Sequence, residues 1–159
     1  HEVMMNENMD QYFVTCQTSN EVRVMRTGVD TLIKVIPVGT YPLKMAVSKK
    51  HDLLFVTCQE DANPNLKSKG SVYVINMNNL QVVKVIKERF YQPHGIGVDD
   101  IRSYLYVVSR NADLNGPAPH HISECGNRNG FFHVIDINTW RVVTNASEIS
   151  VDPYSADVR

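Results

Sequence analysis

The chain has 159 residues, of which 43% are hydrophobic and 21% charged, and its formal net charge at pH 7 is -1. This near-neutral globular composition gives no electrostatic reason to expect nucleic acid or an anionic membrane as a partner. No apolar run approaches the roughly 18 residues that a membrane span requires, so we expect no span in this segment. The chain begins at His1 without a signal-peptide pattern, which indicates that it starts inside a longer protein.

The predicted elements follow an internal repeat. The run Phe13 to Gln17 recurs as Phe55 to Gln59 with the same five residues, and the related segment Pro93 to Arg110 is a third copy. A second run follows each copy, at Val22 to Met25, Val72 to Ile75 and Phe132 to Ile135. Short runs of Val, Ile, Phe and Tyr between polar and glycine-containing segments favour strands over amphipathic helices.

In the second copy we predict four strands, at about residues 44–48, 53–58, 71–76 and 81–86. The polar segments Asn76 to Asn79 and Asp136 to Thr139 supply residues that suit tight turns. Because strands joined by tight turns pair antiparallel, each copy is expected to be one four-stranded antiparallel sheet.

A four-stranded unit that recurs about every 42 to 51 residues predicts an all-β fold, and a β-propeller rather than a sandwich. We predict a single partial propeller domain over residues 1–159, with blades at about 1–36, 42–86 and 93–146 and the start of a fourth at about 149–159. Propellers usually have four to eight blades, so these do not close a ring. We expect the remainder of the chain or other subunits to complete it, and a segment of a propeller of about seven blades is the simpler interpretation.

Three features resemble the YVTN-type β-propeller repeat: the Phe-Val-Thr core, the Asp/Asn-rich turn before the last strand, and the Ile-Pro-Val-Gly-x-x-Pro step from Ile36 to Pro42. The resemblance covers nearly the whole chain. It implies a bacterial or archaeal protein of the periplasm, the cell surface or the exterior. The family includes surface-layer proteins, binding modules and a few enzymes, so the resemblance does not fix an activity.

A more distant resemblance is to the propeller domain of nitrous-oxide reductase. In that domain, Pro-His at the start of the inner strands is implied to present copper ligands. Only Pro93-His94 and His1 fit the pattern here.

Two connections between the second and third strands of a repeat are long, at residues 60–70 and 111–130. In an up-and-down blade they open on the same face as the connections from one blade to the next. Long loops on a rigid scaffold are the usual location of binding sites. The candidate ligand-binding residues on this face are Asp61, Arg110, Asn111, Asp113 and Arg128.

Four side chains on this face are candidate metal ligands, namely His94, His120, His121 and Cys125. Imidazole and thiolate are ligands that Zn²⁺ and copper ions favour. The competing interpretation is that the loop histidines form hydrogen bonds and that His94 bonds to the backbone of a neighbouring blade. We expect no cofactor, with copper or zinc as the alternative.

Other residues that attract attention have structural explanations. Cys16 and Cys58 take the same position in successive blades, too far apart for a disulfide, so we expect them to be packing residues. Asp99 and Asp100 are expected to end a strand and cap a turn. Trp140 aligns with Leu80 and Asp30 in the repeat.

These observations favour a non-catalytic, extracytoplasmic binding or assembly module whose long-loop face recognises a protein, a glycan or a small ligand. The alternative is a metal-binding redox or hydrolytic protein that uses the His and Cys residues of that face.

Overall fold

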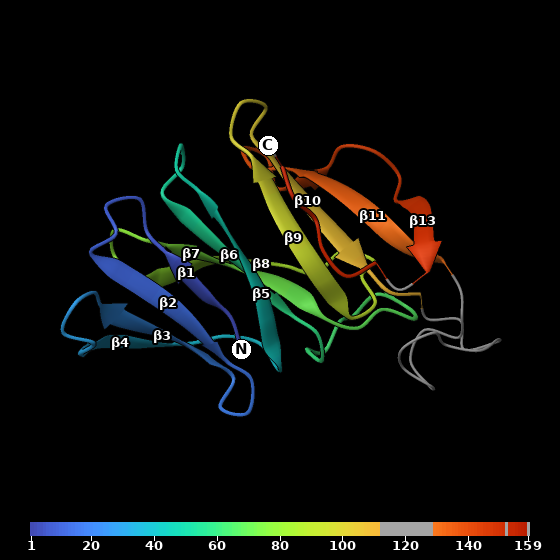
Figure 1. Cartoon of the computed structure of the whole chain (residues 1–159). Coiled ribbons are helices and arrows are strands. Elements are labelled where there is room, and N and C mark those ends of the chain that lie inside the picture. Colours follow the sequence, from blue (N-terminus) through green and yellow to red (C-terminus); the bar gives the residue numbers. More distant parts are fainter. Residues whose placement is uncertain (112–128, 152, 159) are drawn as a thin grey trace.

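The computed structural model describes residues 1–111, 129–151 and 153–158, which form thirteen strands and no helix (Figure 1). Within these ranges there is no helix long and apolar enough to span a membrane. The strands are β1 (Val3–Met5), β2 (Gln11–Cys16), β3 (Glu21–Arg26), β4 (Leu32–Pro37), β5 (Pro42–Ser48), β6 (Leu53–Cys58), β7 (Ser71–Asn76), β8 (Gln81–Ile86), β9 (Pro93–Asp99), β10 (Tyr104–Ser109), β11 (Asn129–Asp136), β12 (Arg141–Val142) and β13 (Ser147–Val151).

The strands form three antiparallel sheets in chain order. Sheet one contains β1 to β4, sheet two contains β5 to β8, and sheet three contains β9 to β12 with β13 beside β11. The predicted all-β class and the three four-stranded units are confirmed. In the second copy β6, β7 and β8 have the predicted bounds, whereas β5 begins earlier, at Pro42. Within the described ranges the sheets do not close into a ring, so the total of about seven blades stays a prediction.

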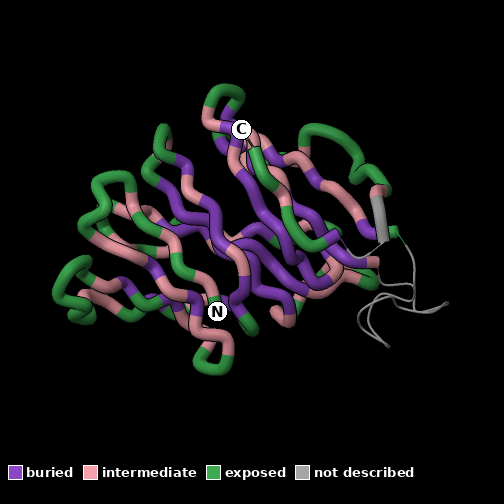
Figure 2. Tube along the Cα trace, viewed as in Figure 1, coloured by how far each residue is buried: buried purple, intermediate pink, exposed green. Residues whose placement is uncertain are grey.

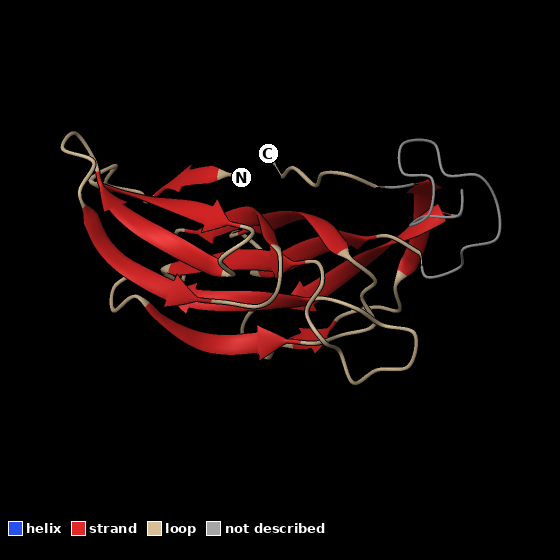
Figure 3. Cartoon of the chain, turned by 90° about the horizontal axis from the view of Figure 1, so that it is seen from below, coloured by secondary structure: helices blue, strands red, loops and turns tan. Residues whose placement is uncertain are grey.

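Sheet two is the middle layer and is covered on both faces (Figures 2 and 3). Every residue of β6 is buried, because alternate side chains point to opposite faces of a strand. Leu54 and Val56 belong to one core cluster with Phe13 of sheet one. Phe55 belongs to the other cluster, with Leu105 of sheet three. Two apolar layers therefore hold the three sheets together.

The outward face of sheet one is covered less. Val14 and Cys16 take the positions in β2 that Val56 and Cys58 take in β6, but they are only half-buried. Both cysteines are free thiols, and burial raises the pKa of the Cys58 thiol to about 12. A thiol with such a pKa is protonated at neutral pH, so Cys58 serves as a small packing residue.

The threonine of the repeated motif joins neighbouring sheets. The Thr15 hydroxyl on β2 donates to the Leu43 carbonyl oxygen on β5 at 3.0 Å. At the equivalent place the Thr57 hydroxyl on β6 donates to the His94 carbonyl oxygen on β9 at 3.2 Å. The third copy carries Val108 there, which has no hydroxyl to donate. The motif thus contributes a hydrogen bond between sheets as well as a strand.

The first strands of the sheets are neighbours, since β5 contacts both β1 and β9, and the two ends of the chain lie on one side of the molecule (Figure 3). The segment 153–158 runs beside β9. A Cβ atom at Gly95 would lie 2.5 Å from the Cα of Ser155, so only glycine permits this approach. The segment therefore lies next to β9 as β9 lies next to β5.

The turns after β7 and β11 are built alike. In each, the side chain of the last strand residue, Asn76 or Asp136, accepts hydrogen bonds from the second and third backbone N–H groups beyond it. Leu80 and Trp140 end these turns with φ of +57° and +59°. Asp30 ends the corresponding turn of sheet one at +52°, which confirms the alignment of these three positions. The Asx side chain stabilises a turn whose last residue is left-handed.

Asp99 and Asp100 cap turns, as predicted. The Asp99 carboxylate accepts from the backbone N–H of Arg102 in its own turn, at 3.0 Å. The Asp100 carboxylate instead caps the turn of sheet two, where it accepts from the Ser48 hydroxyl and from the backbone N–H of Lys49. The carboxylate pair therefore orders two turns on the side opposite the long loops.

Candidate functional site

The long loop of sheet two and the connection from sheet two to sheet three share one face. Lys69 and Tyr91 form an isolated parallel bridge between them. The Asn63 side chain donates to the Glu88 carbonyl oxygen at 2.8 Å, and the Asn65 side chain donates to a neighbouring carbonyl at 2.6 Å. These contacts confirm that the loop between β6 and β7 and the connection from β8 to β9 lie on the same face of the molecule.

On this face a groove of about 820 Å³ lies between sheets two and three. Its walls come from the long loop of sheet two, the connection to sheet three, the end of β10, and the strands β11 and β12. The lining residues are Asn65, Leu66, Lys67, Ser68, Glu88, Arg89, Tyr91, Arg110, Asn111, Phe131, His133, Val142, Asn145 and Ala146. A cavity of this size with mixed apolar and polar walls is typical of ligand sites.

Arg110 at this groove is held by a chain of polar contacts. Its side chain is buried, and Nη1 donates to Oε1 of Gln92 at 2.9 Å. The Gln92 amide donates in turn to a carboxylate oxygen of Glu60 at 2.6 Å, and Lys69 pairs with the other Glu60 oxygen at 2.6 Å. These contacts fix the orientation of the Arg110 guanidinium beside the groove.

The aromatic part of the groove is continuous with the core. His133 has its Nε2 atom 3.1 Å from the Ser109 hydroxyl, and its ring meets the Phe90 ring edge-on at a centroid distance of 5.0 Å. Burial lowers the pKa of His133 to about 4, so the imidazole is neutral at pH 7. His133 therefore contributes shape and a neutral polar edge, not a positive charge.

The exposed cations of the groove are Lys67 and Arg89. Neither makes an ion pair with another described residue. Leu66, between Asn65 and Lys67 in the loop, is 90% exposed. Among the described residues, the edge of the groove thus offers two cationic side chains and one exposed leucine to solvent.

The predicted ligand-binding residues separate into three groups. Arg110 and Asn111 line the groove. Asp61 does not: its carboxylate accepts from the Ser71 hydroxyl at 2.9 Å and lies against Gly39, where an added Cβ atom would be 2.8 Å from the Asp61 Cγ. Asp113 and Arg128 lie outside the described residues.

The predicted metal ligands are not brought together by the described residues. His94 is 4% exposed, its Nδ1 lies 2.9 Å from the Tyr154 carbonyl oxygen, and the two rings are 3.8 Å apart. This is the backbone contact that the structural interpretation of His94 expected. His120, His121 and Cys125 fall outside the described ranges. Within those ranges no three His, Cys, Asp or Glu side chains are grouped as a metal site.

Sequence reasoning missed the groove residues Arg89, Tyr91 and Phe131. They come from two sheets and from a connection that the repeat treats as a linker. A usable signal was present: the connection after sheet two carries Arg89-Phe90-Tyr91, whereas the equivalent residues after sheet one are Val38-Gly39-Thr40.

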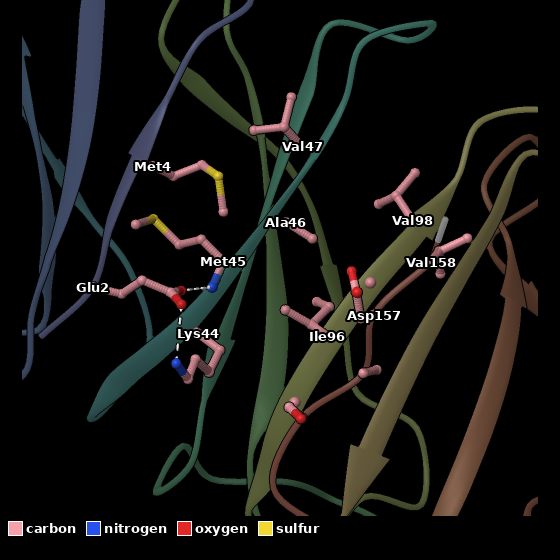
Figure 4. A pocket seen from close by; sticks show the side chains of 14 residues that line it. Glu2, Met4, Lys44, Met45, Ala46, Val47, Ile96, Val98, Asp157 and Val158 are labelled. Carbon is pink, nitrogen blue, oxygen red and sulfur yellow. Dashed lines mark hydrogen bonds and ion pairs between the residues drawn. The ribbon is translucent and has the colours of Figure 1, made fainter.

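A second, smaller hollow of about 320 Å³ lies along the first strands of the sheets (Figure 4). The Glu2 carboxylate at one end pairs with Lys44 at 3.1 Å and accepts from the backbone N–H of Met45. The walls carry apolar side chains such as Met4 and Ile96. Because the carboxylate is already paired, this hollow is a weaker candidate than the groove.

No family model and no curated protein matches the chain. Among solved structures it is similar to hydrazine synthase of Kuenenia stuttgartiensis, with a TM-score of 0.74 at 20% identity over 93% of this chain and 36% of that one. It is similar to the WD40 repeats of RRP9, with a TM-score of 0.70 at 11% identity over 99% of this chain and 42% of that one. It is also similar to a protein of unknown function from Bacteroides caccae, with a TM-score of 0.65 at 15% identity over 92% of this chain and 48% of that one.

These similarities show a propeller-type fold and no activity, because every identity is low. The chain spans less than half the length of each of these structures. Nothing in the comparisons identifies the YVTN family, which stays a resemblance.

Proposed function

We propose that the chain is part of a non-catalytic, extracytoplasmic propeller module that binds another protein through its long-loop face. The propeller-type neighbours suggest a binding or scaffold module. The groove between sheets two and three is the observation that carries the proposal, since it lies on the face where the loops are longest. The extracytoplasmic location rests on the resemblance to the YVTN repeat.

The chemistry of the groove supports binding rather than catalysis. The described lining contains one imidazole, that of His133, and its hydroxyl partner Ser109 is a fully buried residue that does not line the groove. A general base works best with a pKa near the operating pH, whereas burial holds the pKa of His133 at about 4. The pair is therefore a weak base beside an inaccessible nucleophile.

The proposal is tested by selection of binders from a display library of random peptides, followed by competition on two variants. Ala146→Trp places a large ring at an exposed position in the groove. Ile101→Trp makes a comparable change at a position that is 88% exposed, in the turn on the opposite side. We expect Ala146→Trp to abolish binding and Ile101→Trp to leave it unchanged.

Two results would reject the proposal. One is a library that yields no binder. The other is a set of binders that ignore Ala146→Trp. A parallel glycan array separates a protein partner from the glycan alternative, because a glycan ligand would bind there and be blocked by the same groove variant.

A further inference from the structure

The outward face of sheet one is an apolar surface that no other described sheet covers (Figure 1). Two rows of cross-strand partners run over its four strands, one formed by Val3, Val14, Arg23 and Val35 and the other by Met5, Tyr12, Met25 and Leu32. Val3 is 60% exposed, Met5 40% and Val35 39%. A contiguous apolar surface of this kind marks a site of association.

The same face of sheet two is covered, and the structure shows by what. Its rows have the register of those in sheet one, with Met45, Val56, Tyr73 and Val85 in place of the first and Val47, Leu54, Ile75 and Val82 in place of the second. Met45 is 3% exposed, against 60% for the equivalent Val3, and Val56 is fully buried. The cover is the other face of sheet one, which contributes Phe13, Val22, Val24 and Ile36 to the shared core cluster.

A hydrogen-bond acceptor of the joint between sheets is also open on sheet one. The Thr15 hydroxyl donates to the Leu43 carbonyl oxygen of sheet two, and the Thr57 hydroxyl donates to that of His94 in sheet three. His1 takes the equivalent position in the first copy of the repeat. Among the described residues none donates to the His1 carbonyl oxygen. A sheet stacked on sheet one in the same way would bring a threonine hydroxyl to it.

The charged residues Arg23 and Glu21 on this face are compatible with such a cover. They form an ion pair with each other at 2.7 Å, so the pair adds no net charge. Tyr73, the equivalent of Arg23, lies against Gly39, in the connection from sheet one to sheet two. A covering sheet would therefore place its own connection over Arg23. The long stem of an arginine lets its guanidinium pass such a connection and reach water.

We propose that the outward face of sheet one is a second interaction surface, which is covered by another four-stranded sheet of this repeat within the same polypeptide. A single extended peptide has the width of one strand, whereas both rows cross four strands, so a sheet is the occupant that fits. The source within one polypeptide follows from the joint already present, where residues 38–41 suffice to connect sheet one to the sheet that it covers. This surface is separate from the groove, whose lining contains no residue of sheet one.

The test adds a second copy of residues 1–42 in front of His1, so that the junction of Pro42 with His1 repeats the natural junction of Pro42 with Leu43. Cys16 of the original copy reports on the face. Cys16→Ser in the added copy, and Cys125→Ser in both the original chain and the duplicated protein, leave Cys16 and Cys58 as the thiols. Alkylation by N-ethylmaleimide in dilute solution is followed by mass spectrometry of the peptides.

We expect Cys16 to be alkylated in the original chain and at least about tenfold more slowly in the duplicated protein, because a covered thiol reacts only when the sheets open locally. Cys58 is buried in the original chain and serves as the internal reference. Its alkylation should be slow in both proteins.

Two matched pairs of substitutions in the added copy locate the contact. Phe13→Asp with Val24→Asp places carboxylates on the side that should face the original sheet one. Val14→Asp with Met25→Asp places the same number of carboxylates on the opposite side. We expect the first pair to restore fast alkylation of Cys16 and the second pair to leave it slow. Circular dichroism compares the strand content of the two duplicated proteins.

Three results would overturn the inference. The first is a Cys16 that reacts as fast in the duplicated protein as in the original chain. The second is slow alkylation that persists with Phe13→Asp and Val24→Asp, since the added residues would then shield the thiol without stacking on it. The third is an original chain that sediments as a discrete dimer and protects Cys16 as its concentration rises, because a second copy would then be the occupant.

Discussion

The hydroxyl group of Thr15 lies between two sheets, where it accepts the backbone N–H of Glu2 at 2.9 Å and donates to the carbonyl oxygen of Leu43 at 3.0 Å. Thr15 is fully buried. Replacing it with valine keeps the shape of the side chain and leaves both backbone groups without this partner. We expect Thr15→Val to lower the free energy of unfolding by about 1 to 2 kcal/mol, measured by urea denaturation. Thr139→Val, at an exposed turn position, should change it by less than about 0.5 kcal/mol.

Asp100 links sheets two and three, in addition to the hydrogen bond from Thr57 to His94. Asp100→Ala removes the acceptor for the Ser48 hydroxyl and for the backbone N–H of Lys49. The same carboxylate also accepts from the backbone N–H of Lys50, at 3.3 Å. We expect a loss of about 1 to 2 kcal/mol of unfolding free energy and faster amide hydrogen exchange at residues 49 and 50. Asn138→Ala, in an exposed turn of sheet three, is the control. Unchanged exchange at these two amides would show that the carboxylate does not order the turn.

The buried imidazole of His133 makes stability depend on pH. Burial lowers the pKa of His133 to about 4 in the folded protein, against about 6.5 in the unfolded chain. Between these values the unfolded state binds more protons, so stability falls as the pH is lowered from about 6.5 towards 4. The loss between pH 7 and pH 5 is expected to be about 2 kcal/mol by urea denaturation. His133→Gln should reduce this loss. The same pH dependence in His133→Gln would assign it to another group.

Gly39 is required by the side chains that lie against it. A Cβ atom there would come within 2.7 Å of the Tyr73 ring and 2.8 Å of the Asp61 Cγ. We expect Gly39→Ala to displace one of them and lower the melting temperature by several degrees, about 1 to 3 kcal/mol of stability. Gly28→Asn is a useful control, because a Cβ at Gly28 meets nothing within 4 Å and Asn tolerates its positive φ. An unchanged melting temperature for Gly39→Ala would show that the side chains of Tyr73 and Asp61 move away from the added methyl group without loss of stability, and would contradict this prediction.

Elemental analysis checks the metal alternative. After dialysis against metal-free buffer, we expect less than about 0.1 copper or zinc per chain. Stoichiometric metal that is lost in His120→Ala or Cys125→Ala would support a metal site in the long loop. Loss of metal in His94→Ala alone would place a ligand next to Tyr154 instead.

The sequence predicts strands better than the site. Strands such as β6 and β7 follow from the repeat, because each copy must bury the same alternating side chains to pack against its neighbours. The capping role of Asp100 is predictable from its type, but its partner turn is not, because that turn belongs to another sheet. Arg89 and Phe131 are far apart in sequence and meet only when sheets two and three pack, so no local pattern connects them. Arg110 and Asn111 were found because they begin a long loop.

The half-buried Val14 and Cys16 of sheet one should make this polypeptide prone to self-association in solution. Apolar surface exposed to water favours association between copies of the chain, and a partly exposed thiol beside it can form intermolecular disulfides when it is oxidised. Stock solutions of these 159 residues should therefore be kept dilute and reduced. Light scattering that climbs with concentration and with storage time is the behaviour to anticipate.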